Sequence, residues 1–169
     1  MKKVRTPSQI KADAAARARA LFVAAIAAVV GVIMLLLSST FLALHCLIAA
    51  AIALAGGIAA ARAAIPFEPQ SFRRAGTLGG IYAALAYALP FMVYNFVRYL
   101  GVNDQTAAER AAELTPDQIA MMEQFNIVVG AEFFRGQDVS YIFGYLLFAL
   151  LFGWVLGIIG GALAKRQMS

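Results

Sequence analysis

Four long apolar runs constrain this sequence more than any other feature. They cover residues 20–38, 41–61, 77–99 and 141–164. Each run is long enough to cross a hydrocarbon core of roughly 30 Å as an α-helix. Hydrophobic residues make up 62% of the chain and charged residues 14%, which is more apolar than a soluble domain of this size. The sequence therefore predicts an all-α, polytopic membrane protein with four transmembrane helices.

The positions of the charged residues predict the topology. Basic residues outnumber acidic ones in residues 1–19, in the loop 62–76 and in the tail 165–169, which together carry a charge of +9. Acidic residues dominate residues 101–138, whose charge is −5. Because basic segments stay on the cytoplasmic side, we expect both termini to be cytoplasmic in a bacterial inner membrane. This topology accounts for the net charge of +5, so no nucleic-acid partner is expected.

The ends and turns of the chain complete the predicted layout. Residues 1–19 are basic and alanine-rich, and indicate a short helix that lies on the membrane or leads into it. The first run is longer than the apolar segment of a typical signal peptide, so we expect a retained helix. Only the hydroxyl residues at 38–40 separate the first two runs, which predicts a tight hairpin. The domains are then a cytoplasmic segment, a four-helix membrane domain over residues 20–164, and the cytoplasmic tail 165–169. Pro90 predicts a kink in the third helix.

Two short helices are expected in the acidic segment that precedes the fourth run. Asp104 can cap the first of them, over residues 105–114. Thr115 and Gln118 have the spacing of a capping box, with proline at the first helical position. They predict a second helix over residues 116 to about 126. We expect the acidic residues of this segment at helix caps and on solvent-facing sides.

Small residues recur at i+4 spacing in the second and fourth runs. They are Ala49, Ala53, Gly57 and Ala61 in the second run, and Ala149, Gly153, Gly157 and Gly161 in the fourth. This spacing lets two helix backbones approach closely in lipid. One interpretation is that these faces pack the four helices against one another. The other is that one face, above all that of the fourth run, receives a helix of a partner subunit or of a second copy.

His45 is the single histidine of the chain and lies about one turn inside the second run. A histidine within a membrane span can ligate haem or a pigment, or hydrogen-bond a quinone. The alternative is a plain structural hydrogen bond. The neighbouring Cys46 points about 100° away on a helix, so the two side chains do not form a chelating pair. No metal site is predicted.

Arg98, Tyr94 and Tyr99 lie near the outer end of the third run. Tyrosines at the headgroup level and an arginine that reaches toward water are typical anchors at a membrane interface. We therefore expect an anchoring role for these three residues, in contact with membrane lipids. The alternative is a polar vestibule or a site for an anionic headgroup.

The residue types needed for catalysis are not combined in this sequence. No acidic residue lies within the four runs, whereas ion-coupled transporters place an ionisable group near the middle of the membrane. The sequence contains no Ser/His/Asp set, no HExxH motif and no glycine-rich phosphate loop. We expect neither enzymatic activity nor a bound cofactor beyond the possible role of His45.

The layout resembles that of uncharacterised bacterial four-pass inner-membrane proteins. The matching features are the tight first hairpin, the helix opened by Thr115 with Met121 and Met122 before the last run, and a glycine-rich final run that ends in Lys165 and Arg166. The resemblance extends over most of the chain and implies no catalytic residues.

Three functional hypotheses follow from these features. The first is a non-catalytic accessory or scaffold subunit of a larger membrane complex, because several helix faces suit close packing while catalytic motifs are lacking. The second is a component of a small-solute carrier or channel that acts as an oligomer. The third is a cofactor-holding membrane subunit that uses His45.

Overall fold

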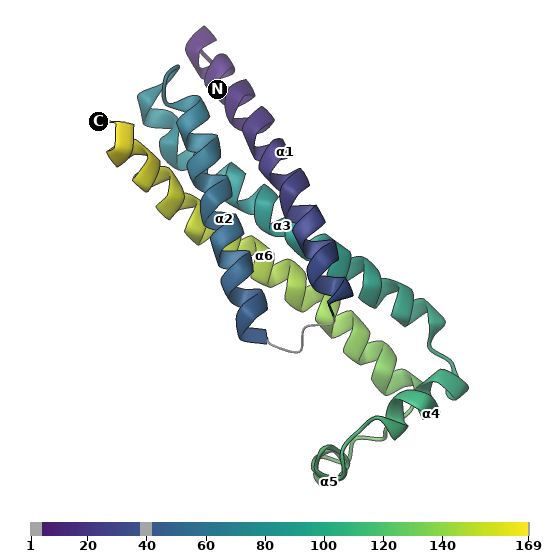
Figure 1. Ribbon diagram of the computed structural model, residues 1–169. Coiled ribbons are helices and arrows are strands. Elements are labelled where there is room, and N and C mark those ends of the chain that lie inside the picture. The colour runs from purple at the N-terminus through teal and green to yellow at the C-terminus, as the bar shows by residue number, and fades with distance from the viewer. Residues whose placement is uncertain (1–4, 38–41, 169) are drawn as a thin grey trace. The chain divides into compact units, whose positions relative to one another are not determined.

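The computed structural model describes residues 5–37 and 42–168, and within these ranges the chain is helical and contains no strand. The helices are α1 (Pro7–Leu36), α2 (Leu42–Ala64), the short 3₁₀ helix η1 (Pro69–Ser71), α3 (Phe72–Gly101), α4 (Asp104–Ala112), α5 (Pro116–Gln124) and α6 (Ala131–Met168) (Figure 1). Of these, α1, α2, α3 and α6 are long and apolar enough to cross a membrane. The predicted helical fold with four candidate spans is thus confirmed. The predicted hairpin at residues 38–40 lies outside the described residues.

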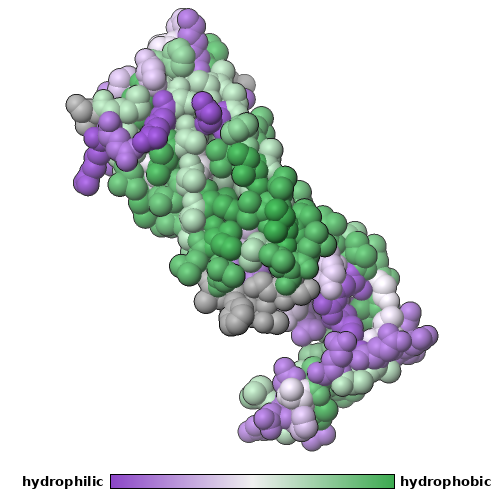
Figure 2. Space-filling model, in the orientation of Figure 1, coloured by the Kyte–Doolittle hydropathy of each residue, from purple (hydrophilic) through white to green (hydrophobic). Residues whose placement is uncertain are grey.

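The chain divides into two compact units. The second unit is residues 92–145, which hold the end of α3, the helices α4 and α5, and the start of α6. The first unit is formed by the described residues of 1–91 and 146–169. In the first unit, the beginning of α1 and the end of α6 lie at the same end (Figure 1). Figure 2 shows hydrophilic residues at that end and hydrophobic residues over the middle of α1 and α2, as expected of helices that leave lipid at a charged border.

The basic N-terminal segment forms the first turns of α1 and is not a separate helix. Thr6 caps the helix: its side chain accepts the N–H of Gln9, and the Gln9 side chain accepts the N–H of Thr6. After Pro7, which suits the first helical position, no glycine or proline follows before Gly31. Nothing in this stretch therefore interrupts the helix where the polar segment meets the apolar run.

Alanine forms most of the core at the charged end of the first unit. One cluster joins Ala12, Ala16 and Ala20 of α1 to Ala60 and Ala64 of α2 and Ala75 of α3. Small side chains let the three backbones approach closely. Next to Ala12 in the sequence, the Asp13 carboxylate accepts hydrogen bonds from Arg5 at 2.9 Å and from Arg74 of α3 at 3.0 Å. The first turns of α1 are thus held against α2 and α3.

Glycines bring α2, α3 and α6 into backbone contact in the first unit. A Cβ built on Gly57 would lie 2.8 Å from the Cα of Gly157, and one built on Gly153 would lie 2.7 Å from the Cα of Ile81. Real Cβ atoms do not approach other atoms so closely, so only glycine fits at these contacts. The other predicted small-residue positions are buried as well: Ala49, Ala53, Ala61, Ala149 and Gly161. The small-residue face of the fourth run is therefore covered by α2 and α3 of the same chain.

The two short helices of the second unit begin with side-chain caps. In α4 the cap is Asn103 and not Asp104, because the Asn103 side chain accepts the N–H of Thr106 at 2.9 Å. Asp104 is the first helical residue, where its negative charge suits the helix N-terminus. The predicted capping box of Thr115 and Gln118 at the start of α5 is confirmed.

The end of α5 is defined by a left-handed residue. Asn126 has a φ of 53°, which asparagine tolerates better than most residues. Its N–H donates to the carbonyl of Glu123 at 3.0 Å, and the N–H of Ile127 donates to the carbonyl of Met122 at 2.9 Å. These two bonds form a Schellman motif, so α5 ends at Gln124, two residues earlier than predicted.

The last helix begins earlier than the apolar run predicts. It begins at Ala131, whereas the fourth run was expected to begin at Tyr141. The first turns of α6 are polar, but Phe134 among them is buried against Val102 and Ala107. This tertiary contact supports helix where the local sequence is not apolar, so α6 begins ten residues before the predicted apolar run.

Candidate functional site

Asp138 is the most unusual residue in the described part of the chain. It lies in the second turn of α6 and is fully buried, with an exposed fraction of 0%. Among the described residues, Asn95 and Asp138 are the buried polar or charged side chains. The expectation that the acidic residues lie at caps and solvent-facing sides is therefore wrong for Asp138. A buried carboxylate is stable only with partners that compensate for lost hydration.

Two arginines face the Asp138 carboxylate. Arg110 of α4 donates from Nη1 to Oδ2 and from Nη2 to Oδ1, both at 2.8 Å. Arg98, near the end of α3, places its Nε 3.8 Å from Oδ1. The Arg110 side chain is 14% exposed and the Arg98 side chain 36% exposed. The two-pronged bond to Arg110 is the strong contact, and Arg98 adds a weaker, partly solvated charge.

Further contacts hold Arg110 in this orientation. Its guanidinium carbon lies 4.4 Å from the centre of the Phe134 ring, and its Nη2 donates to the Gln137 side chain at 3.3 Å. Phe134, Gln137 and Asp138 occupy adjacent turns of α6, so α6 presents a ring, an amide and a carboxylate to one guanidinium. We call Arg98, Arg110, Phe134, Gln137 and Asp138 the arginine–aspartate cluster.

An apolar contact and a third arginine support the arginine–aspartate cluster. Val102, Ala107 and Phe134 form a buried group that joins the end of α3 to α4 and α6. Arg135 donates to the carbonyl of Val102 at 3.0 Å and pairs with Glu132. The carbonyl groups just beyond the end of a helix carry partial negative charge, so Arg135 stabilises the exit from α3. Together these contacts hold α4 to the beginning of α6.

Sequence reasoning identified one member of this cluster, Arg98, as a site residue and missed the other four. Arg98 was expected at the membrane interface with Tyr94 and Tyr99, and the structure adds its contact with Asp138. The Arg98 guanidinium carbon lies 5.5 Å from the centre of the Tyr94 ring, and the Tyr99 ring stacks on Phe96 at 6.4 Å. The anchoring role of these three residues stays a prediction. The four-residue spacing of Phe134 and Asp138 was the available signal, because it places both on one helix face.

His45 forms a contact between α2 and α3 in the first unit. Its Nδ1 lies 3.0 Å from the hydroxyl of Tyr87, at hydrogen-bond distance. The ring of Phe91 meets the His45 ring edge to face, with centres 5.2 Å apart. This geometry agrees with the structural hydrogen bond that the sequence left open as one alternative. The cofactor role of His45 stays a prediction.

The arginine–aspartate cluster is a buried ion pair that joins α4 to α6. The Asp138 carboxylate accepts a bidentate bond from Arg110, and no group of three or more His, Cys, Asp or Glu side chains with metal-binding geometry occurs in residues 5–37 and 42–168. Comparison with protein-family models, with curated proteins and with solved structures gives no match. The arrangement itself is thus the basis for a functional proposal.

Proposed function

We propose that this chain is a non-catalytic accessory subunit of a larger membrane complex, and that it binds its partner through α5 and the residues that follow it. The observation that carries the proposal is the exposure of this segment. No residue of α5 is buried. In the segment that follows α5, Phe125 is 68% exposed and Val128 is 86% exposed. The apolar side chains exposed between residues 119 and 128 are Ile119, Met121, Phe125, Ile127 and Val128. Contiguous exposed apolar residues are typical of interaction surfaces.

The local structure of α5 suits a binding role. A nine-residue helix is marginal in water by itself. Here the Thr115 capping box defines its start and the Schellman motif at Asn126 defines its end. The caps hold the segment in a defined conformation without using its apolar side chains. A partner surface can therefore bury those side chains with little additional ordering of the helix.

The packing of the first unit supports a scaffold role over a solute pathway within one chain. Alanine and glycine fill its core, and the α2, α3 and α6 backbones touch at Gly57, Gly153 and Gly157. Helices in such contact leave little room for a solute between them. The N-terminal and C-terminal segments are basic, whereas residues 101–138 are acidic. This difference supports a cytoplasmic position for both termini in a bacterial inner membrane. In that topology α5 is available to a partner on the outer side.

The proposal is tested by purifying the tagged protein from its native membrane in a mild detergent and identifying its companions by mass spectrometry. We expect recovery with other membrane subunits in a fixed ratio. The double variant Phe125→Gln/Val128→Gln is expected to lose these subunits, because it removes the two most exposed apolar side chains of the segment.

The matched control is the double variant Ile10→Gln/Phe67→Gln, which changes two exposed apolar residues of the first unit. Ile10 is 57% exposed and Phe67 is 46% exposed. This control is expected to keep the companion subunits. Recovery of the wild-type chain by itself would contradict the subunit proposal and would favour the carrier hypothesis. Equal loss from both double variants would show that α5 is not the binding segment.

A further inference from the structure

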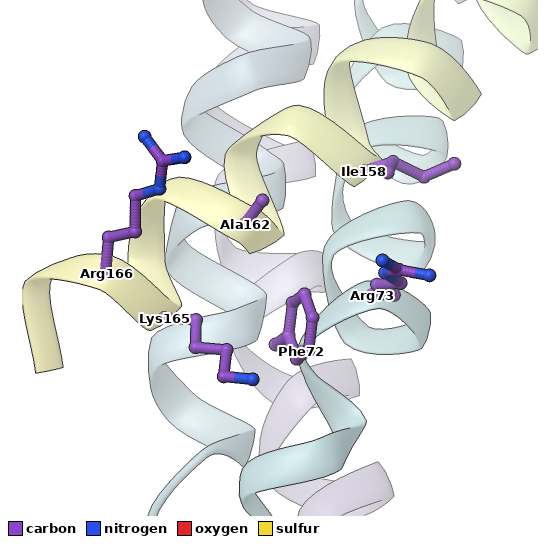
Figure 3. Close-up of a pocket in the computed structure, with 6 residues that line it drawn as sticks. All are labelled: Phe72, Arg73, Ile158, Ala162, Lys165 and Arg166. Carbon is purple, nitrogen blue, oxygen red and sulfur yellow. The ribbon is translucent and has the colours of Figure 1, made fainter. Parts of the chain in front are cut away.

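An open groove with a basic lining lies at the charged end of the first unit. It is bounded by the beginning of α3 and the end of α6 and has a volume of about 480 Å³. Its lining residues are Phe72, Arg73, Ile158, Ala162, Lys165 and Arg166 (Figure 3). Three of these six are cationic and none is acidic, so an anion is the complementary occupant.

Two of the cations are arranged around one aromatic ring. The Lys165 ammonium lies 4.7 Å from the centre of the Phe72 ring, and the Arg73 guanidinium carbon lies 5.7 Å from it. Figure 3 shows the Phe72 ring between these two side chains. Within residues 5–37 and 42–168, neither Arg73 nor Lys165 has an acidic side chain within ion-pair distance. Among the described residues, two like charges thus lie around one ring without a compensating carboxylate.

The position of Arg73 at the start of a helix makes its positive charge more costly when no carboxylate lies beside it. Arg73 is the second residue of α3, and the first turn of this helix contains no acidic residue. A cation is unfavourable at a helix N-terminus, because the helix dipole is positive there. The neighbouring Arg74 is compensated by Asp13, whereas Arg73 lines the groove (Figure 3). Lys165 and Arg166, in contrast, lie at the end of α6, where the dipole favours cations.

The groove changes from charged to apolar along α6. Ala162 and Ile158 lie about one and two turns before the basic pair at the end of the helix. Both are half-buried, and both belong to the apolar part of the candidate span. A ligand that matches this lining needs a negative group at one end and a hydrocarbon chain at the other.

We propose that this groove is a binding site for one anionic phospholipid. Its phosphate lies between Arg73, Lys165 and Arg166, and an acyl chain follows Ala162 and Ile158 into the hydrocarbon core. Basic pockets beside membrane helices bind such headgroups, and each basic residue near an anionic headgroup strengthens binding about fivefold, which corresponds to about 1 kcal/mol. The site is independent of α5, so its occupancy and the partner-binding proposal are tested separately.

The test measures lipid binding to the full chain in a mild detergent by native mass spectrometry. The probes are phosphatidylglycerol and phosphatidylcholine with the same acyl chains. We expect the wild-type chain to bind phosphatidylglycerol more tightly than phosphatidylcholine. The variant Arg73→Gln/Lys165→Gln is expected to bind phosphatidylglycerol roughly 30-fold more weakly, since two cations are lost, and to bind phosphatidylcholine as before.

Two further variants keep the test specific. Lys11→Gln/Arg17→Gln removes the same charge from exposed positions on α1 outside the groove, and it is expected to bind phosphatidylglycerol as the wild type does. The charge-conserving variant Arg73→Lys/Lys165→Arg is expected to retain most of the binding. Equal binding of the two lipids by the wild type, or equal loss in the α1 variant, would overturn the proposal. Displacement of the lipid by millimolar inorganic phosphate would overturn it in favour of a free-anion site.

Discussion

Replacing Asp138 with alanine removes the carboxylate that both arginines of the arginine–aspartate cluster face. Asp138 is 0% exposed and both of its oxygens accept from Arg110, which is itself 14% exposed. Loss of one partner from a buried ion pair costs about 3–5 kcal/mol, because the other charge is left buried. Arg110 keeps some access to water, so we expect a value near the lower limit, about 3 kcal/mol. The half-exposed Arg98 adds at most about 1 kcal/mol.

A second variant separates the charge effect from the loss of packing. In Arg110→Met/Asp138→Leu both charges are replaced by apolar side chains, which removes the unpaired group. Such replacements of buried ion pairs are often neutral or stabilising. The double variant is therefore expected to be more stable than Asp138→Ala, although Arg98 loses a contact. Together with the single variants Arg110→Met and Asp138→Leu, the double variant completes the cycle that measures the coupling of the pair.

The effect is expected to be local to the second unit, so the assay follows local opening. Hydrogen exchange of the backbone amides of α4 (Asp104–Ala112) in detergent reports whether this helix stays docked on α6. A loss of about 3 kcal/mol corresponds to roughly 100-fold faster exchange. Glu132→Ala is the control, because this carboxylate is 87% exposed and its pair is worth at most about 1 kcal/mol.

Two results would refute this reasoning. Unchanged exchange of α4 in Asp138→Ala would show that the ion pair does not hold α4 in place. Equally fast exchange in the single and double variants would show that side-chain packing, and not an uncompensated charge, accounts for the loss.

Three other variants test separate features of the fold. Gly157→Leu is expected to lower the stability in detergent by about 1–3 kcal/mol, because a Cβ there would lie 2.6 Å from a carbonyl oxygen of α3. Gly144 lies on the same helix with open space around it, so Gly144→Ala should leave the stability unchanged or raise it. Asn126→Gly should preserve the end of α5, whereas Asn126→Val should cost about 1–2 kcal/mol in its left-handed conformation, read by hydrogen exchange of α5. Tyr87→Phe removes the hydrogen bond to His45 and should lower the thermal stability by about 1 kcal/mol; no change would count against the structural role of that bond.

Local features of the sequence were sufficient to predict much of the fold. The four apolar runs identify the candidate spans, because crossing lipid requires a continuous apolar helix of defined length. The capping box at Thr115 was predictable because its two bonds join residues three positions apart. The spacing of Gly153 and Gly157 indicated a close-packed face, because helix periodicity alone places these residues on one side.

The tertiary structure decided which of these features meet. Whether the small-residue face of α6 packs on its own chain or on a partner depends on how helices distant in sequence approach each other, and here Gly157 meets Gly57. Asp138 looked like a surface acid because it lies in the acidic segment 101–138, yet it is buried and pairs with Arg110, 28 residues away. The groove in which Lys165 meets Phe72 is equally non-local. Helix periodicity and capping depend on residues within one or two turns of each other in the sequence. Burial, ion pairing and grooves depend on how segments that are distant in the sequence pack together.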